Sequence, residues 1–117
     1  MVRILIVEDE VRLASFIEKG LVRQGFETLI AEDGQQALQL LGHMDFDIVL
    51  LDLSLPVFDG WTVLQSIRQR GISVSVIIVT ALMDERDRAR VLAAGANDYL
   101  RKPFRFNDLL TMIQKYT

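Results

Sequence analysis

Three apolar runs constrain the fold of this 117-residue chain more than any other feature, because none of them alternates with polar residues. Residues 4–7, 48–51 and 76–79 each contain four consecutive aliphatic side chains. A strand that faces water on one side alternates apolar and polar residues, whereas a strand buried on both faces is continuously apolar. The three runs therefore predict central strands of a parallel sheet covered by helices on both faces.

The segments around these runs predict two further strands and five helices. Weaker strand patterns lie at residues 27–31 and 98–100, and Asp33 is a candidate N-cap. The predicted helices cover about residues 13–24, 34–41, 59–70 and 84–94, with a last helix that carries residues 109–116. Right-handed crossovers then predict an α/β, flavodoxin-like, doubly wound fold with five parallel strands in the order 2-1-3-4-5. We expect one domain over residues 1–117 and no second domain in this chain.

Composition narrows the possible functions. The chain has no cysteine, which excludes disulfides, thiolate metal sites and cysteine catalysis. A formal charge of −3 argues against direct nucleic-acid binding by this domain. No apolar stretch approaches the roughly 18 residues of a membrane span, and the N-terminus lacks a signal-peptide pattern. We therefore expect a cytoplasmic domain that does not contact a membrane.

Each apolar run ends in a polar group. Glu8 and Asp9 follow the first run, Asp52 follows the second, Thr80 follows the third, and Lys102 follows the short strand at 98–100. Ligands of open α/β sheets bind at the carboxyl ends of the strands, so these groups are expected to converge. Taken singly, each has an ordinary structural explanation, such as a helix cap or a solvated lysine. Together they form a specific constellation.

The donor set of this constellation suits a hard cation and a phosphoryl group. Carboxylate oxygens without a nearby histidine or cysteine favour Mg²⁺ over zinc or copper. An ammonium, a hydroxyl and a metal ion around a carboxylate nucleophile provide what phosphoryl transfer needs. The natural nucleophile is Asp52, which would form an acyl phosphate.

Read together, the motifs resemble the receiver domain of bacterial two-component response regulators over essentially the whole chain. The matching motifs are residues 5–10 (LIVEDE), 52–56 (DLSLP) with 59–60 (DG), 79–81 (VTA), 95–99 (GANDY) and 102–104 (KPF). The resemblance implies that Asp52 receives a phosphoryl group from the phosphohistidine of a sensor histidine kinase. It also implies a signalling switch and not an enzyme, with only self-directed phosphotransfer and autodephosphorylation.

The same resemblance assigns roles to the site residues. Asp9, Asp52 and the backbone carbonyl of Ser54 would ligate Mg²⁺ directly, and Glu8 would act mainly through water. Lys102 would contact the acyl phosphate, and its peptide bond to Pro103 is expected to be cis. Thr80 would move toward the phosphate while Tyr99 swings inward. These movements would bias a two-state surface made by the fourth helix, the fifth strand and the last helix.

A charged surface points to the winged-helix transcription-factor branch of the family. In that branch, the surface made by the fourth helix, fifth strand and last helix forms a symmetric homodimer on phosphorylation. Arg88 with Asp108 fits the branch pattern, and Asp98 fits it too, but the usual arginine partner of Asp98 is Met112 here. A solvated helix face is the alternative explanation of these charges. The output would be transcription through a DNA-binding domain absent from this chain, although a single-domain regulator remains the alternative.

Two residues near the site bear on the lifetime of the phosphate. In this family, the positions two beyond the nucleophile and two beyond the hydroxyl influence how an attacking water is oriented. Here these positions hold Ser54 and Leu82, neither of which is a carboxylate or an amide. We therefore expect slow self-dephosphorylation, with a half-life of minutes or longer.

Three other functions fit the residues less well. A phosphohydrolase with an aspartate nucleophile usually carries a second acid at the position of Ser54, and it needs a cap domain. A flavin-type binder needs a Ser/Thr/Gly-rich phosphate loop where residues 8–10 are all acidic. A receiver-like scaffold that is never phosphorylated would be expected to lack part of the site, whereas every acidic and basic member is present.

Overall fold

A single sheet of parallel strands organises the part of the chain that the computed structural model describes, residues 1–81 and 84–117. Its five strands have the order β2-β1-β3-β4-β5. The strands are β1 (Arg3–Val7), β2 (Glu27–Ala31), β3 (Ile48–Leu51), β4 (Ser75–Thr80) and β5 (Asp98–Arg101). This order confirms the predicted flavodoxin-like, doubly wound fold.

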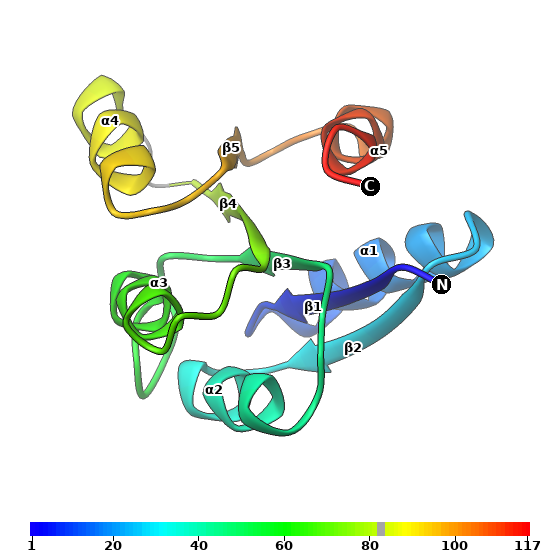
Figure 1. The fold of residues 1–117 in the computed structure, drawn as a ribbon. Coiled ribbons are helices and arrows are strands. Elements are labelled where there is room, and N and C mark those ends of the chain that lie inside the picture. Colours follow the sequence, from blue (N-terminus) through cyan, green and yellow to red (C-terminus); the bar gives the residue numbers. More distant parts are fainter. Residues whose placement is uncertain (82–83) are drawn as a thin grey trace.

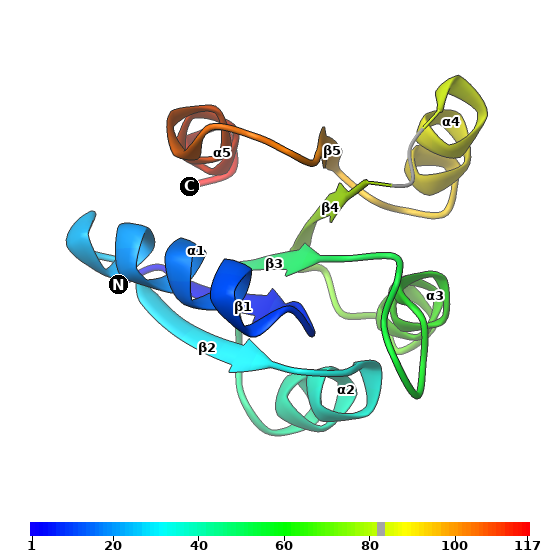
Figure 2. The ribbon, with the colours of Figure 1, turned by 180° about the vertical axis from the view of Figure 1, so that it is seen from behind.

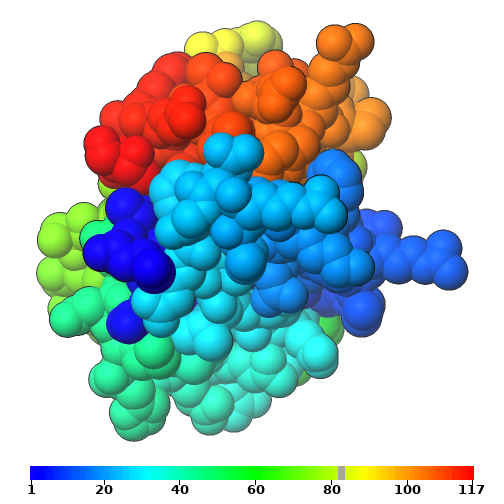
Figure 3. Space-filling model, turned by 90° about the vertical axis from the view of Figure 1, so that its right-hand side faces the viewer, coloured from blue at the N-terminus to red at the C-terminus, as the bar shows by residue number. Residues whose placement is uncertain are grey.

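The helices form a layer on each face of the sheet. They are α1 (Val11–Arg23), α2 (Gly34–His43), α3 (Gly60–Gln69), α4 (Glu85–Ala93) and α5 (Phe106–Gln114). Helices α1 and α5 lie together on one face, and α2, α3 and α4 cover the other (Figures 1 and 2). From the side of α1, blue atoms of that helix lie next to the orange and red atoms of the C-terminal segment (Figure 3). Among the described residues, no helix is long and apolar enough to cross a membrane.

The apolar runs separate two hydrophobic clusters. All residues of the runs 4–7, 48–51 and 76–79 are at most 3 % exposed. Successive side chains of a strand point to opposite faces. Accordingly Ile4 and Ile6 pack with α1 and α5, whereas Leu5 and Val7 pack with α2, α3 and α4. Burial on both faces explains why these three runs contain no polar residue.

Aspartate side chains mark where three helices begin. The Asp33 carboxylate accepts a hydrogen bond from the Gln36 backbone N–H at 2.8 Å, which confirms Asp33 as an N-cap. Asp59 caps α3 in the same way, and Asp84 forms a capping box at the start of α4. These caps orient the helices that follow the polar edge of the sheet.

The opposite edge of the sheet, at the amino ends of the strands, carries a small charge network. The Arg3 guanidinium donates to the Glu27 carboxylate at 3.1 Å. The Arg3 backbone N–H donates to the Asp47 carboxylate at 2.8 Å. Because all strands are parallel, this network is separated from the polar residues by the length of the strands.

Candidate functional site

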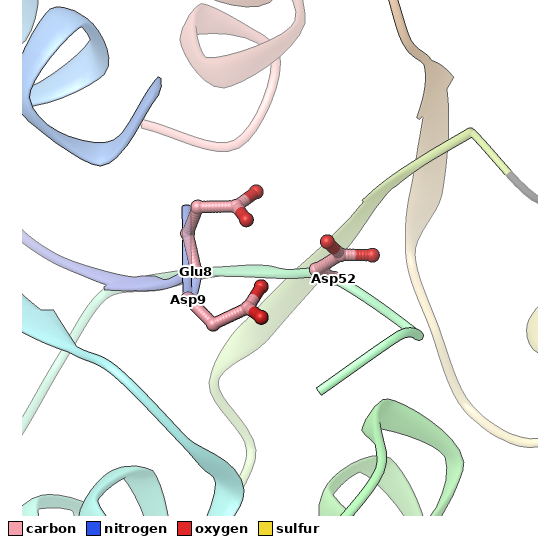
Figure 4. Close-up of side chains that lie close together, drawn as sticks. All are labelled: Glu8, Asp9 and Asp52. Carbon is pink, nitrogen blue, oxygen red and sulfur yellow. The ribbon is translucent and has the colours of Figure 1, made fainter. Parts of the chain in front are cut away.

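An acidic cluster lies at the carboxyl ends of β1 and β3. The two strands are neighbours with Val7 opposite Leu51, so the residues that follow them lie side by side. Glu8, Asp9 and Asp52 each contribute one carboxylate oxygen to a group in which all three lie within 4.8 Å of one another. The three side chains point into the same space (Figure 4). The structure therefore brings together the acidic residues that the strand pattern predicted.

The three carboxylates differ in exposure. Glu8 is 4 % exposed and Asp52 is 6 % exposed, whereas Asp9 is exposed. Buried carboxylates need partners, because desolvation disfavours their charged form. Asp9 thus forms the solvent-facing side of the cluster, from which an ion or a substrate can enter.

Lys102 supplies the positive partner of the buried carboxylates. Its ammonium donates to Glu8 Oε1 at 2.6 Å and to Asp52 Oδ2 at 2.9 Å. The backbone N–H of Lys102 donates to the Thr80 carbonyl at 3.0 Å, so the end of β4 positions this lysine. The Lys102–Pro103 peptide bond is cis, as predicted.

The charges of the cluster do not balance. Three carboxylates face one ammonium, so two negative charges remain uncompensated when all three acids are ionised. Burial raises the pKa of Glu8, against the hydrogen bonds from Lys102 and from the Glu10 backbone N–H. Burial alone would lower the pKa of Lys102, but its hydrogen bonds to Glu8 and Asp52 outweigh it and raise that pKa. Such a site attracts a divalent cation.

The backbone around Asp52 is held tightly. The Asp52 N–H donates to the Val7 carbonyl at 3.2 Å, and the Ser54 N–H donates to Asp52 Oδ1 at 3.1 Å. A Cβ at Gly60 would overlap the Asp52 backbone oxygen, so only glycine lets α3 begin this close to the site. Ser54 is therefore shown as a donor to Asp52, and its role as a carbonyl ligand stays a prediction.

Thr80 ends β4 and is fully buried. It lies beside the site through its backbone, since its carbonyl accepts the Lys102 N–H. Its predicted movement toward a phosphate stays a prediction. Leu82, which we singled out for dephosphorylation, lies outside the described residues.

The predicted switch surface is made of α4, β5 and α5. The Arg88 guanidinium lies 4.6 Å from the centre of the Tyr99 ring, a cation–π contact that sequence spacing did not reveal. The Asp108 side chain is exposed on α5. Within the described part of the chain, no ion pair joins Arg88 to Asp108 in the same copy. Their pairing across a dimer stays a prediction.

Arg68 was missed by sequence reasoning. From α3 it donates to the Gly95 and Ile72 carbonyls at 3.0 and 2.8 Å, and to Asn97 Oδ1 at 3.0 Å. It thereby fixes the connection from α4 to β5. A charged residue on an amphipathic helix gives no signal that distinguishes this role from ordinary surface polarity.

Fold and site together define a doubly wound α/β protein with an acidic, lysine-bridged site at the carboxyl ends of its central strands. Residues 4–114 match the family model described as the response regulator receiver domain. The chain is 36 % identical over 114 residues to the transcriptional regulatory protein PcoR of Escherichia coli, covering 97 % of this chain and 50 % of PcoR. It is 42 % identical over 112 residues to the transcriptional activator protein IrlR of Burkholderia pseudomallei, and the match covers 96 % of this chain and 48 % of IrlR.

A solved structure agrees with these matches. The receiver domain of the sensor histidine kinase PA1611 from Pseudomonas aeruginosa, solved with a magnesium ion coordinated in its active-site cleft, superposes with a TM-score of 0.89. It is 36 % identical, and the match covers 98 % of this chain and 96 % of that one. The chain belongs to the response regulator receiver domain family. It spans about half the length of the curated relatives it matches.

Proposed function

We propose that the chain is a Mg²⁺-dependent phosphoacceptor switch of the cytoplasm, in which residues 1–117 form one receiver domain. A sensor histidine kinase donates the phosphoryl group, and Asp52 accepts it. The observation that carries this proposal is the position of Lys102, whose ammonium contacts both Glu8 and Asp52 inside the acidic cluster. No substrate other than the domain itself is turned over, so the chain is a switch and not an enzyme.

The donor set fits Mg²⁺, since the cluster offers only carboxylate oxygens within 4.8 Å of one another. Asp9, Asp52 and the Ser54 carbonyl would hold the ion directly, and Glu8 would hold it through water. When bound, Mg²⁺ supplies positive charge that draws the acceptor carboxylate and the phosphate oxygens together. The magnesium ion in the PA1611 receiver supports this choice of metal.

The transfer itself asks little covalent chemistry of the protein. A carboxylate oxygen of Asp52 attacks the phosphorus, the bond from phosphorus to the histidine nitrogen breaks, and the imidazole leaves with the electron pair. The Ser54 N–H holds Asp52 Oδ1 at 3.1 Å and keeps the carboxylate oriented. Lys102, now 2.9 Å from Asp52 Oδ2, would exchange this contact for an oxygen of the new phosphoryl group.

The phosphorylated state would then be sensed by Thr80 and Tyr99 and expressed on α4, β5 and α5. We propose that this surface forms a homodimer in which Arg88 pairs with Asp108 of the second copy, with Asp98 on the same surface. The whole protein would control transcription through a part that lies outside these 117 residues, as the names of PcoR and IrlR suggest. This domain itself would not bind DNA.

The central assignment is tested by mass. Wild-type protein and Asp52→Asn are incubated with acetyl phosphate and Mg²⁺, and intact masses are measured. We expect a gain of one phosphoryl group in the wild type and none in Asp52→Asn. A gain in both proteins, or in neither, would contradict the assignment. Asp33→Asn, which alters a carboxylate that caps α2 and is not a member of the acidic cluster, is the matched control and should gain mass as the wild type does.

A further inference from the structure

Both oxygens of the Asp98 carboxylate are used within the protomer. Asp98 Oδ1 accepts the backbone N–H of Tyr99 at 2.9 Å. Asp98 Oδ2 lies 2.9 Å from the hydroxyl of Tyr116. Asp98 begins β5, whereas Tyr116 follows the end of α5 at Gln114. One side chain thus joins the strand that carries the proposed switch residue to the C-terminal residues of the chain.

The Tyr116 hydroxyl is held from two sides. It also lies 2.9 Å from the Asn97 carbonyl, so its single proton faces two acceptors. Tyr116 packs against the hydrophobic cluster formed by α1, α5 and one face of β1, β3 and β4. Burial and the hydrogen bond to Asp98 raise the pKa of the phenol, as expected for a hydroxyl that donates to a carboxylate.

Neighbouring groups do not offer Asp98 a better partner. The Lys115 ammonium is 3.9 Å away on a side chain that is 61 % exposed, and such pairs contribute little. Met112, at the position where the winged-helix branch is expected to place an arginine, carries no charge and packs against the core. The Asp98 side chain is only 20 % exposed. Each of its oxygens already accepts a hydrogen bond within the protomer, so Asp98 offers a second copy an occupied, mostly buried acceptor in place of a free carboxylate.

We infer that Asp98 and Tyr116 form an intramolecular clasp, which fixes the C-terminal residues to β5 and takes Asp98 out of the charge pairing between two copies. The pairing across the dimer is then left to Arg88 and Asp108. The part that concerns the dimer rests on the proposed function, whereas the clasp itself does not. A segment that follows Thr117 would start from a point tied to the backbone of Tyr99.

A double-mutant cycle tests the clasp. Tyr116→Phe keeps the ring and removes only the hydroxyl. In wild type we expect this change to raise the unfolding equilibrium constant about fivefold, as for the loss of one hydrogen bond. In an Asp98→Ala background the hydroxyl keeps only the Asn97 carbonyl as its acceptor, so the same change should have a clearly smaller effect there. Equal effects in the two backgrounds would overturn the clasp. Lys115→Met is the control, with an expected effect below about twofold.

Sedimentation of the protein activated with beryllofluoride, a phosphoryl mimic, tests the consequence for the dimer. We expect Asp108→Ala to weaken the dimer about tenfold or more, and Asp98→Ala to change its Kd less than about threefold. Equal weakening by the two variants would place Asp98 in the interface and overturn the inference. If the wild type stays monomeric, the dimer of the proposed function is wrong, and the double-mutant cycle alone upholds or overturns the clasp.

Discussion

At the scale of single residues, Lys102 controls the electrostatics of the site, because its ammonium contacts the carboxylates of two buried residues, Glu8 and Asp52. Lys102→Met keeps most of the side-chain volume and removes the charge. We expect the free energy of unfolding, measured by urea titration without divalent ions, to fall by about 3 kcal/mol, since two buried carboxylates lose their cation. Added Mg²⁺ should increase the free energy of unfolding of this variant by more than it increases that of the wild type.

Lys115→Met is the matched control for that experiment. The Lys115 side chain is 61 % exposed and its ammonium lies 3.9 Å from Asp98. The same substitution there should change the free energy of unfolding by less than about 0.5 kcal/mol. Equal losses of unfolding free energy in the two variants would show that the ammonium of Lys102 does not stabilise the fold more than an exposed lysine does.

The raised pKa of the Tyr116 phenol makes the stability of the fold depend on pH in the alkaline range. Its pKa is raised in the folded protein above the ordinary value of 10.0 by burial and by the hydrogen bond to Asp98. The protonated phenol therefore stabilises the fold fully below pH 10, and this contribution is lost as the pH rises through the folded-state pKa. We expect the stability difference between wild type and Tyr116→Phe to be constant below pH 10 and to shrink above it, measured by urea titrations across this range. A difference that grows with pH would contradict this.

The site residues could be predicted from the sequence, whereas the clasp could not. Asp52 and Lys102 were predictable because each directly follows a strand, and parallel strands bring their carboxyl ends to one edge. The contact of Tyr116 with Asp98 was not predictable. It joins the end of one helix to the start of a strand through side chains, and no periodicity records which of many surface groups will meet.

At the scale of elements, the loop between β3 and α3 contains a strained residue. Val57 has a φ of 70°, a region that β-branched residues avoid. Its side chain is 67 % exposed, so little packing depends on it. We expect Val57→Gly to raise the free energy of unfolding by about 0.5–1 kcal/mol, because relief of strain exceeds the entropic cost of glycine. Thermal or urea unfolding would measure this change.

The same substitution in a helix should act in the opposite direction. Val22 on α1 is 54 % exposed and has ordinary helical surroundings. Val22→Gly should lower the free energy of unfolding by about 0.4 kcal/mol through helix propensity alone. A loss of stability in Val57→Gly as well would show that the positive φ at Val57 is not strained.

The sequence predicted the types of the helices and strands correctly, but it predicted the residues at which they end less accurately. The predicted strand at residues 27–31 coincides with β2, and the N-cap at Asp33 was recognisable from its side chain. Strands β4 and β5 each run one residue further than expected, to Thr80 and Arg101. Both end residues are polar and so resemble loop residues in sequence, although backbone pairing between the two strands continues through them.

At the scale of the whole molecule, the uncompensated acidic cluster predicts that a divalent cation stabilises the fold. A ligand that binds only the folded state adds about 2.7 kcal/mol at one hundred times its Kd. We expect the Tm to rise with Mg²⁺ concentration in the wild type. Asp9→Asn removes the exposed acid of the cluster and should abolish most of this rise, whereas Asp84→Asn at the cap of α4 should retain it. An undiminished rise in Asp9→Asn would argue against the proposed site.

The charge network of Arg3, Glu27 and Asp47 has a consequence for how the molecule tolerates change. It lies one strand length from the acidic cluster, about 16 Å for five residues of β1. At that separation two unit charges interact about five times more weakly than charges in direct contact at about 3 Å. The two ends of the sheet are therefore only weakly coupled electrostatically. The amino-end rim can be recharged, labelled or tethered to a surface with little effect on the field in which the phosphoryl chemistry would take place.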